Sequence, residues 1–244
     1  MDAALLTLAA CATALATGIG AVPVLLLGPR IAAMAAALWG AAGGVMVVAA
    51  VAGLLLPALE ESGTGGVLAG LTVGVLAMSV SSFTLRRRSG LHLGTLDGPG
   101  ARRAFLVAGT LFAHSLPEGL AIGAAWASGG APGAFVVFAI ALQNVPEGMV
   151  TALPLREAGF SSTRIFWAAV ATSAPQVPGA LLAYWAVTSV DNLLGFSYGL
   201  AAGAMLALVI LEVSPAARER PARGAAGAVA GVVVMTALAI ALKV

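Results

Sequence analysis

The sequence predicts an all-α fold, a polytopic membrane helix bundle with eight transmembrane helices and both termini outside the cell. The first observation is composition, because 60% of the 244 residues are hydrophobic and only 9% are charged, with a mean hydropathy of +1.03. The second is length, because a membrane-spanning helix needs about 20 apolar residues and the apolar runs leave room for eight such helices. The third is the placement of arginine, which indicates the orientation.

Composition also excludes several classes of protein. The formal net charge of +2 and the sequence pI near 9.2 accompany no nucleic-acid-binding motif, so we expect the lipid bilayer, and no nucleic acid, as a partner. A single cysteine, Cys11, excludes an intramolecular disulfide framework and a thiolate-rich metal site. The N-terminus carries Asp2 but no Lys or Arg, so we expect the first 27 residues to form a helix and not a cleaved signal peptide.

Apolar runs separated by glycine-rich, proline-rich or charged segments define the expected elements. Irregular backbone and open sheet edges cannot face lipid, and the runs lack the two-residue alternation of barrel strands, so each run should be a helix. In chain order the expected spans are 3–27, 31–57, 65–85, 104–127, 132–155, 164–188, 193–213 and 222–242. Together they form a single transmembrane domain over residues 1–244, with a longer cytoplasmic loop at 86–103.

Basic residues justify these spans in turn, because cytoplasmic loops are enriched in Lys and Arg. With the N-terminus outside, the connections after the first, third, fifth and seventh spans are cytoplasmic. Eleven of the twelve basic residues lie in or next to these connections. From the first inner connection to the fourth, they are Arg30; Arg86, Arg87, Arg88, Arg102 and Arg103; Arg156 and Arg164; and Arg218, Arg220 and Arg223. One span more or fewer would scramble this pattern, so the arginines support the count of eight.

An internal repeat places ionisable side chains inside two neighbouring spans. The fourth span contains His-Ser-Leu-Pro-Glu-Gly and the fifth contains Gln-Asn-Val-Pro-Glu-Gly. His114 and Glu118 are four residues apart, as are Gln143 and Glu147, so each pair lies on one face of its helix. Ionisable residues deep in a membrane span mark an ion or substrate pathway. If the two faces meet, these four side chains converge.

The four residue types favour a divalent metal ion as the substrate. An imidazole, two carboxylates and an amide oxygen suit Zn²⁺, with Fe²⁺, Mn²⁺, Co²⁺ and Cd²⁺ as competitors. A proline before each glutamate removes a backbone donor and frees a carbonyl one turn earlier, which suits a hydrated cation path. An amide in place of a second histidine would also release the ion easily. We therefore expect a transporter that carries the metal as cargo and needs no cofactor.

Three alternatives stay open at this stage. His114 could pair with Glu118 or Glu147 as a hydrogen-bond cluster that locks two helices together. The cluster could instead hold the catalytic zinc of a membrane-embedded hydrolase, although such sites usually use two or three histidines. The same residues could relay protons in a carrier of an organic solute.

Other polar positions lie along the expected pathway. Glu60 and Glu61 follow the second span at its outer mouth, where a pair of carboxylates would concentrate cations. Glu212, near the inner end of the seventh span, is either an interfacial residue or an exit ligand. The run 172–179 in the sixth span is unusually polar and broken, so it should also face the pathway. His92 lies in the long cytoplasmic loop and is expected to be an ordinary loop histidine.

These motifs resemble the ZIP family of divalent metal transporters, the zinc- and iron-regulated transporter-like proteins. The runs 114–119 and 143–148 resemble the family's motifs in helices four and five, and 44–57 and 203–215 resemble its helices two and seven. The resemblance covers nearly the whole chain. It implies eight helices with both termini outside, a metal site between helices four and five, and uptake of metal into the cytoplasm. It also implies that helices one, four, five and six move against the others.

The chain departs from the family at a second metal site that many members carry beside the first. Where those members have Asn, Asp and Glu, this sequence has Ser115, Asn144 and Gln176, which are all neutral. We therefore expect a single bound ion. The resemblance also places Met46 where the family can make a further contact from helix two, although a methionine in a span more often packs than binds.

Two expectations concern the cellular setting. Arginine outnumbers lysine eleven to one amid abundant alanine and glycine, which is typical of a GC-rich prokaryotic genome. The expected location is therefore the plasma (inner) membrane of a prokaryote, as a multi-pass protein. A second copy of the chain, as a homodimer, is a further partner that the sequence leaves open.

Overall fold

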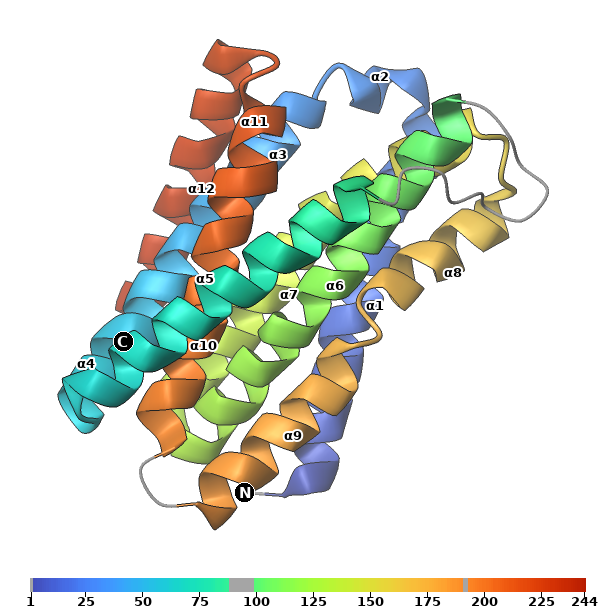
Figure 1. Ribbon diagram of the computed structural model, residues 1–244. Coiled ribbons are helices and arrows are strands. Elements are labelled where there is room, and N and C mark those ends of the chain that lie inside the picture. The colour runs from blue at the N-terminus through green and yellow to red at the C-terminus, as the bar shows by residue number, and fades with distance from the viewer. Residues whose placement is uncertain (1, 88–98, 191–192) are drawn as a thin grey trace.

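The computed structural model confirms the all-α prediction (Figure 1). It describes residues 2–87, 99–190 and 193–244, and within these residues there are helices and no strands. Eight helices are long and apolar enough to cross a membrane. They are Ala3–Leu27, Ala35–Glu61, Thr64–Leu85, Ala104–Ser128, Gly130–Glu157, Ser162–Ser189, Leu193–Ala217 and Pro221–Leu242.

Several spans consist of more than one helical element. The first span is α1 (Ala3–Leu27), and a short helix α2 (Pro29–Ala32) connects it to the second. The second span consists of α3 (Ala35–Val48), the π-helical segment η1 (Ala49–Leu55) and α4 (Leu56–Glu61). The remaining elements are α5 (Thr64–Arg87), α6 (Pro99–Ser128), α7 (Gly130–Glu157), α8 (Ser162–Thr172), α9 (Gln176–Ser189), α10 (Leu193–Leu208), the π-helical η2 (Val209–Val213), α11 (Ser214–Ala217) and α12 (Pro221–Leu242).

Two spans run past the residues at which we expected them to end. The second span continues beyond Pro57 to Glu61, and the seventh continues beyond residue 213 and Pro215 to Ala217. Each proline follows a π-helical segment and lies in the first turn of the next helix, where its missing N–H costs least. The second span also begins at residue 35 and not at 31, because α2 is a separate turn.

Glycines bring the helices into close backbone contact, as is typical of helix packing in lipid. Between α1 and α7, a Cβ atom on Gly148 would overlap the carbonyl oxygen of Thr17. Between α6 and α9, a Cβ atom on Gly119 would lie 2.8 Å from Cα of Gln176. We call α1, α6, α7, α8 and α9 the site unit, because these helices carry the polar side chains described below.

The other four spans form a second set of glycine contacts. Between α3 and α12, a Cβ atom on Gly40 would lie 2.9 Å from the carbonyl carbon of Gly224. Between α5 and α10, a Cβ atom on Gly74 would lie 2.8 Å from the amide nitrogen of Ala204. We call α3, η1, α4, α5, α10, η2, α11 and α12 the frame unit. The close glycine contacts therefore join helices mainly within each unit.

Two hydrophobic clusters show where the units are joined. The larger cluster contains buried residues from both units, among them Leu54 and Tyr198 of the frame and Phe135 of the site unit. The smaller cluster draws its buried residues from α1, α6, α7 and α8, with Ile31 of α2 added. The site unit thus has a core of its own at the end near α2, whereas the opposite end is packed against the frame.

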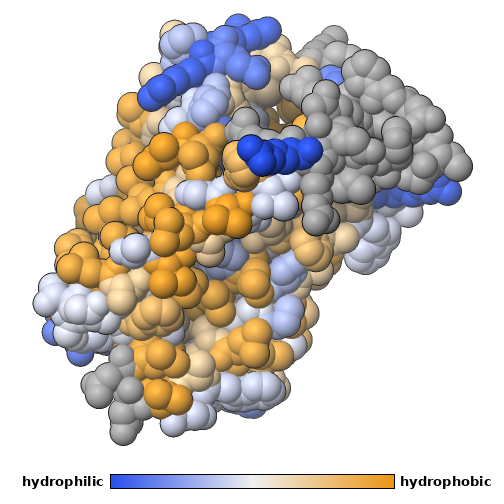
Figure 2. Space-filling view, in the orientation of Figure 1, coloured by the Kyte–Doolittle hydropathy of each residue, from blue (hydrophilic) through white to orange (hydrophobic). Residues whose placement is uncertain are grey.

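The surface is that of a protein embedded in lipid. Hydrophobic side chains cover the middle of the face in Figure 2, and hydrophilic ones gather at the end that carries α11. Large apolar residues such as Leu76 on α5 and Val233 on α12 are exposed. Both termini lie at the end opposite α2 and α11 (Figure 1).

Candidate metal centre

Four polar side chains meet where α6 and α7 pack together. His114 and Glu118 lie one turn apart on α6, and Gln143 and Glu147 lie one turn apart on α7. Each of the four is at most 2% exposed. The two faces that the internal repeat predicted do face each other in the structure.

The distances within this cluster are short enough for one metal ion. His114 Nε2 lies 3.2 Å from Glu118 Oε1 and 3.9 Å from Glu147 Oε1. One potential ligand atom from each of these three side chains lies within 4.8 Å of the other two. Among the described residues, no other group of three His, Cys, Asp or Glu side chains is so arranged.

Several buried polar atoms of the cluster make no hydrogen bond. They are both ring nitrogens of His114, Oε1 of Gln143 and Oε1 of Glu147. An unsatisfied buried polar atom costs about 1–3 kcal/mol, so a protein rarely collects four of them at one point without a purpose. Imidazole nitrogens and carboxylate or amide oxygens are ligands of divalent metals. A bound ion would give these atoms the partners that the protein does not supply.

Electrostatics favour a divalent cation at the same place. Glu118 and Glu147 bring two carboxylates into a buried region, where like charges repel far more than they do in water. Gln143 Nε2 donates a hydrogen bond to Glu118 Oε1, which orients the amide oxygen of Gln143 away from that carboxylate. One ion of charge +2 would neutralise both glutamates without any further group.

The prolines of the two motifs do not break their helices. Both α6 and α7 continue through Pro117 and Pro146, so the expected opening is limited to the backbone donor that each proline lacks. The break lies in the sixth span, as the polar run at 172–179 predicted. There α8 ends at Thr172 and α9 begins at Gln176.

A closed network of neutral side chains lies beside the cluster. Gln176 Nε2 donates to Glu118 Oε2 at 2.8 Å. Asn144 and Gln176 exchange hydrogen bonds of 3.3 Å in both directions, and Asn144 Nδ2 also donates to the carbonyl of Thr13 at 2.6 Å. Ser115 turns away and donates to the carbonyl of Leu111 on its own helix, at 2.9 Å.

Sequence analysis missed the threonines of α1 that belong to this polar layer. Thr13 Oγ1 lies 2.8 Å from Gln176 Oε1, and the hydroxyls of Thr17 and Ser173 are 2.6 Å apart. All of these side chains are buried. The available signal was the four-residue spacing of Thr13 and Thr17 in a largely apolar span, which puts both on one helix face.

The accessory positions lie in different parts of the molecule. Met46 is fully buried in the larger hydrophobic cluster on α3, and Glu60 and Glu61 are exposed at the end of α4. Glu212 lies in η2 and lines a cavity of about 250 Å³, together with Trp39, Thr110 and Glu219. His92 lies outside the described residues.

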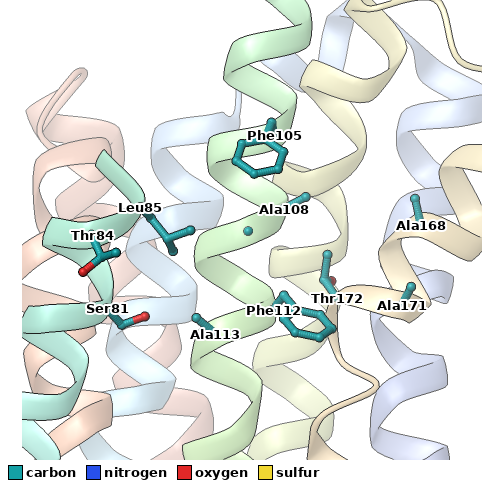
Figure 3. A pocket seen from close by; sticks show the side chains of 11 residues that line it. Ser81, Thr84, Leu85, Phe105, Ala108, Phe112, Ala113, Ala168, Ala171 and Thr172 are labelled. Atoms are coloured by element: carbon teal, nitrogen blue, oxygen red, sulfur yellow. The ribbon is translucent and has the colours of Figure 1, made fainter. Parts of the chain in front are cut away.

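A larger cavity of about 710 Å³ lies on the other side of α6 (Figure 3). Phe105 and Phe112 of α6 project between Leu85 of α5 and Thr172 of α8. Ala113, the residue before His114, also lines this space. Both cavities therefore lie between the site unit and the frame unit, along the first half of α6. Residues 86–87 and 99–103, which we expected in the cytoplasmic loop, belong to α5 and α6 in the structure.

Comparison with known proteins gives consistent matches. Residues 93–239 match the family model described as ZIP zinc transporter. The chain is 34% identical over 242 residues to a provisionally named zinc transporter of Arabidopsis thaliana, covering 96% of this chain and 38% of that protein. It is 35% identical over 216 residues to zinc transporter ZIPB of Bordetella bronchiseptica, covering 82% of this chain and 68% of that protein.

A third relative is more distant. The chain is 32% identical over 154 residues to zinc transporter ZIP11 of Xenopus tropicalis, covering 60% of this chain and 44% of that protein. The chain thus spans less than half the length of the plant and frog proteins, and about two thirds of the bacterial one.

Proposed function

Because this chain belongs to the ZIP family of zinc transporters, we propose that it carries a divalent metal ion, Zn²⁺ foremost, across a membrane through the centre between α6 and α7. The family consists of membrane transporters, so the chain is not an enzyme. The hydrolase alternative is therefore set aside, and the metal is cargo instead of a cofactor.

One observation carries the proposal: the unsatisfied buried atoms of His114, Gln143 and Glu147 converge within a membrane-spanning bundle. A hydrogen-bond cluster that only locked two helices would pair its polar atoms with one another. Here the histidine makes no hydrogen bond, although a carboxylate oxygen lies 3.2 Å away. The geometry thus favours an ion-binding site over a structural lock.

The donor set supports Zn²⁺ and admits Cd²⁺, Fe²⁺, Mn²⁺ and Co²⁺. One imidazole and oxygen ligands form a borderline-to-hard site, and affinity alone does not distinguish these metals. The three named relatives are all described as zinc transporters. We therefore place zinc first among them.

The proposed site holds a single ion. Asn144 and Gln176 commit their amide oxygens to hydrogen bonds with each other and with Thr13. Neither residue adds negative charge. The two glutamates alone balance one divalent cation, so a second ion beside the first would lack both ligands and neutralising charge.

The division into two units supports transport by relative movement. Glycine contacts join the helices within each unit, and the cavities of about 710 and 250 Å³ lie between the units. Both cavities line the half of α6 next to the arginine-rich loop that we assign to the cytoplasm. We infer that the structure corresponds to a state open toward the cytoplasm, and that the site unit moves against the frame to admit metal from outside.

The proposed setting is the plasma (inner) membrane of a prokaryote, with both termini outside and with metal moving into the cytoplasm. The chain would act there as one transmembrane domain. Glu60 and Glu61 would attract cations at the outer mouth. Glu212 would line the route of release.

Uptake of Zn²⁺ into liposomes that contain the purified protein tests this function. We expect saturable uptake, competition by Cd²⁺, and loss of uptake in His114→Ala and Glu147→Ala. Ser79→Ala is the control, because its hydroxyl is on α5 and donates to the carbonyl of Val75 within the same helix. Uptake that is indifferent to His114→Ala and Glu147→Ala would contradict the proposal. Absent zinc uptake combined with pH-driven uptake of an organic solute would instead support the proton-coupled carrier.

A further inference from the structure

We propose that Gln176 is a positioning residue that holds Glu118 in the orientation needed to bind the transported ion. The inference rests on the proposed function, because it concerns the same centre. It differs from our expectation for the sequence, in which Gln176 was an accessory residue of the pathway. In the structure its role is to donate a hydrogen bond to a ligand.

The two carboxylate oxygens of Glu118 have different partners. Gln176 Nε2 donates to Oε2 at 2.8 Å. The other oxygen, Oε1, lies 3.2 Å from His114 Nε2 and accepts a hydrogen bond from Gln143. Gln176 therefore binds Oε2 of Glu118, and Oε1 faces His114 and Gln143 of the cluster.

Gln176 is itself held on every side. Its second side-chain N–H donates to Asn144 Oδ1 at 3.3 Å. Its side-chain oxygen Oε1 accepts from Asn144 Nδ2 at 3.3 Å and from Thr13 Oγ1 at 2.8 Å. The side chain is 0% exposed, so water does not compete for these bonds. Because both N–H groups and the oxygen are engaged, the amide cannot rotate without losing several hydrogen bonds at once.

The backbone explains how Gln176 reaches Glu118. The sixth span breaks at Ser173–Pro175, and Gln176 is the first residue of α9. A Cβ atom on Gly179 would lie 2.7 Å from the carbonyl oxygen of Leu116, so only glycine lets the start of α9 approach α6 this closely. The amide is thereby presented to Glu118, two residues further along α6.

Groups that hydrogen-bond to metal ligands commonly change metal affinity about 10–100-fold when they are removed. We therefore expect Gln176→Met, which fills a similar volume without an N–H donor, to weaken Zn²⁺ binding by roughly that factor. In transport, KM for Zn²⁺ should rise while the maximal rate changes much less. Thr13→Val keeps the shape of the side chain and removes one of the two hydrogen bonds to the side-chain oxygen of Gln176. It should weaken binding in the same direction by a smaller factor.

The matched control is Ser173→Ala. It removes the buried hydrogen bond between the hydroxyls of Ser173 and Thr17, which joins the sixth span to the first, and leaves the side-chain contacts of Glu118 and Gln176 in place. We would measure Zn²⁺ binding to the full-length protein in detergent by equilibrium dialysis, and thermal unfolding of the same samples. A positioning role predicts that Ser173→Ala lowers thermal stability but keeps parental affinity, whereas Gln176→Met loses affinity.

Each outcome decides a different point. Parental affinity in Gln176→Met and Thr13→Val would overturn the positioning role, while the proposed function would stand if His114→Ala abolished binding. Equal loss of affinity in Ser173→Ala would also overturn it, because the effect would then be one of general packing. If Gln176→Met fails to fold, Thr13→Val decides the question by the same comparison. A parent protein that binds no Zn²⁺ would overturn both proposals.

Discussion

At the scale of single residues, several buried polar atoms of the centre lack hydrogen bonds, whereas the polar atoms beside it have them. His114, Gln143 and Glu147 carry buried atoms without hydrogen bonds. A few ångströms away, Asn144 and Gln176 have every N–H engaged. In a membrane interior this difference matters, because each unpaired polar group is costly. In the proposed function, it separates the atoms available to an ion from the atoms that hold the ligands in place.

The repeated motif predicted the four residues of the cluster, but not their neighbours. The spacing of four fixes which side chains share a helix face, and the structure brings the faces of α6 and α7 together. The bond between Gln176 and Glu118 could not be predicted, because it depends on the close approach of α9 at Gly119 and Gly179. That approach depends on how α6 and α9 pack in three dimensions, and the spacing of residues within one helix does not reveal it.

A first prediction concerns the number of bound ions. We expect the parent protein to bind one Zn²⁺ per chain at saturation, because the amide pair beside the centre is neutral and fully hydrogen-bonded. Replacing both amides by carboxylates, as Asn144→Asp with Gln176→Glu, should raise the stoichiometry to two, because oxygen ligands and charge for a second ion are then present. Metal analysis after equilibrium dialysis measures this number. Two ions bound to the parent would contradict the prediction.

At the scale of the elements, glycine decides which helices pack most closely against each other. Each unit is held by backbone contacts that a single methyl group would disturb, for example Gly148 against Thr17 in the site unit. Small residues are what makes such interfaces stable in lipid, where no hydrophobic driving force joins the helices. The positions of these glycines therefore support the division of the bundle into the site unit and the frame unit.

The number of helices was predictable because composition and the arginine pattern are independent signals. The π-helical segments η1 and η2 were not, and we therefore expected helix ends at Pro57 and before Pro215. A proline normally ends a helix because it lacks a donor. The adjustment that lets these two helices continue is a change of hydrogen-bond register over several residues, which sequence spacing does not reveal.

A second prediction tests the packing of α1 against α7. We expect Gly148→Ala to lower the free energy of unfolding by about 1–3 kcal/mol, because the added methyl group overlaps the carbonyl oxygen of Thr17. Gly65→Ala is the matched control, since nothing lies within 4 Å of a Cβ atom there. Thermal unfolding of both variants in detergent gives the comparison. Equal stability of the two would show that the contact at Gly148 relaxes without cost.

At the scale of the whole molecule, the two units pack against each other at one end, and cavities lie between them at the other. Near the termini, Phe135 of α7 packs against Gly53 of η1, and Ser128 and Tyr198 join α6 to α10 by a hydrogen bond of 2.9 Å. At the other end, along the first half of α6, the two cavities described above lie between the units. In the orientation proposed above, with the termini outside, this asymmetry corresponds to a carrier that is closed outside and open inside.

A third prediction concerns that outer seal. Tyr198→Phe removes the hydrogen bond to Ser128, and a hydrogen bond contributes about 0.5–1.5 kcal/mol, so the equilibrium between the two states should shift about two- to tenfold toward the outward-open one. Thiol labelling from the cytoplasmic side, at Thr110→Cys in a Cys11→Ser background, should slow accordingly.

The control for this experiment is Ser79→Ala on α5. Its hydroxyl donates at 2.7 Å to the carbonyl of Val75 in the same helix, so its loss leaves the contact between the units intact. Labelling should then proceed at the parental rate. If Tyr198→Phe also labels at that rate, the bond between Ser128 and Tyr198 does not hold the outer end closed.

The most direct test of the central claim is to locate the metal in crystals of the protein grown with Zn²⁺, by anomalous scattering at the zinc edge. We predict one strong peak per chain between α6 and α7, bounded by His114, Glu118 and Glu147, and its loss in His114→Ala. A peak elsewhere in the bundle, with this cluster empty, would contradict the claim that these residues bind the transported ion.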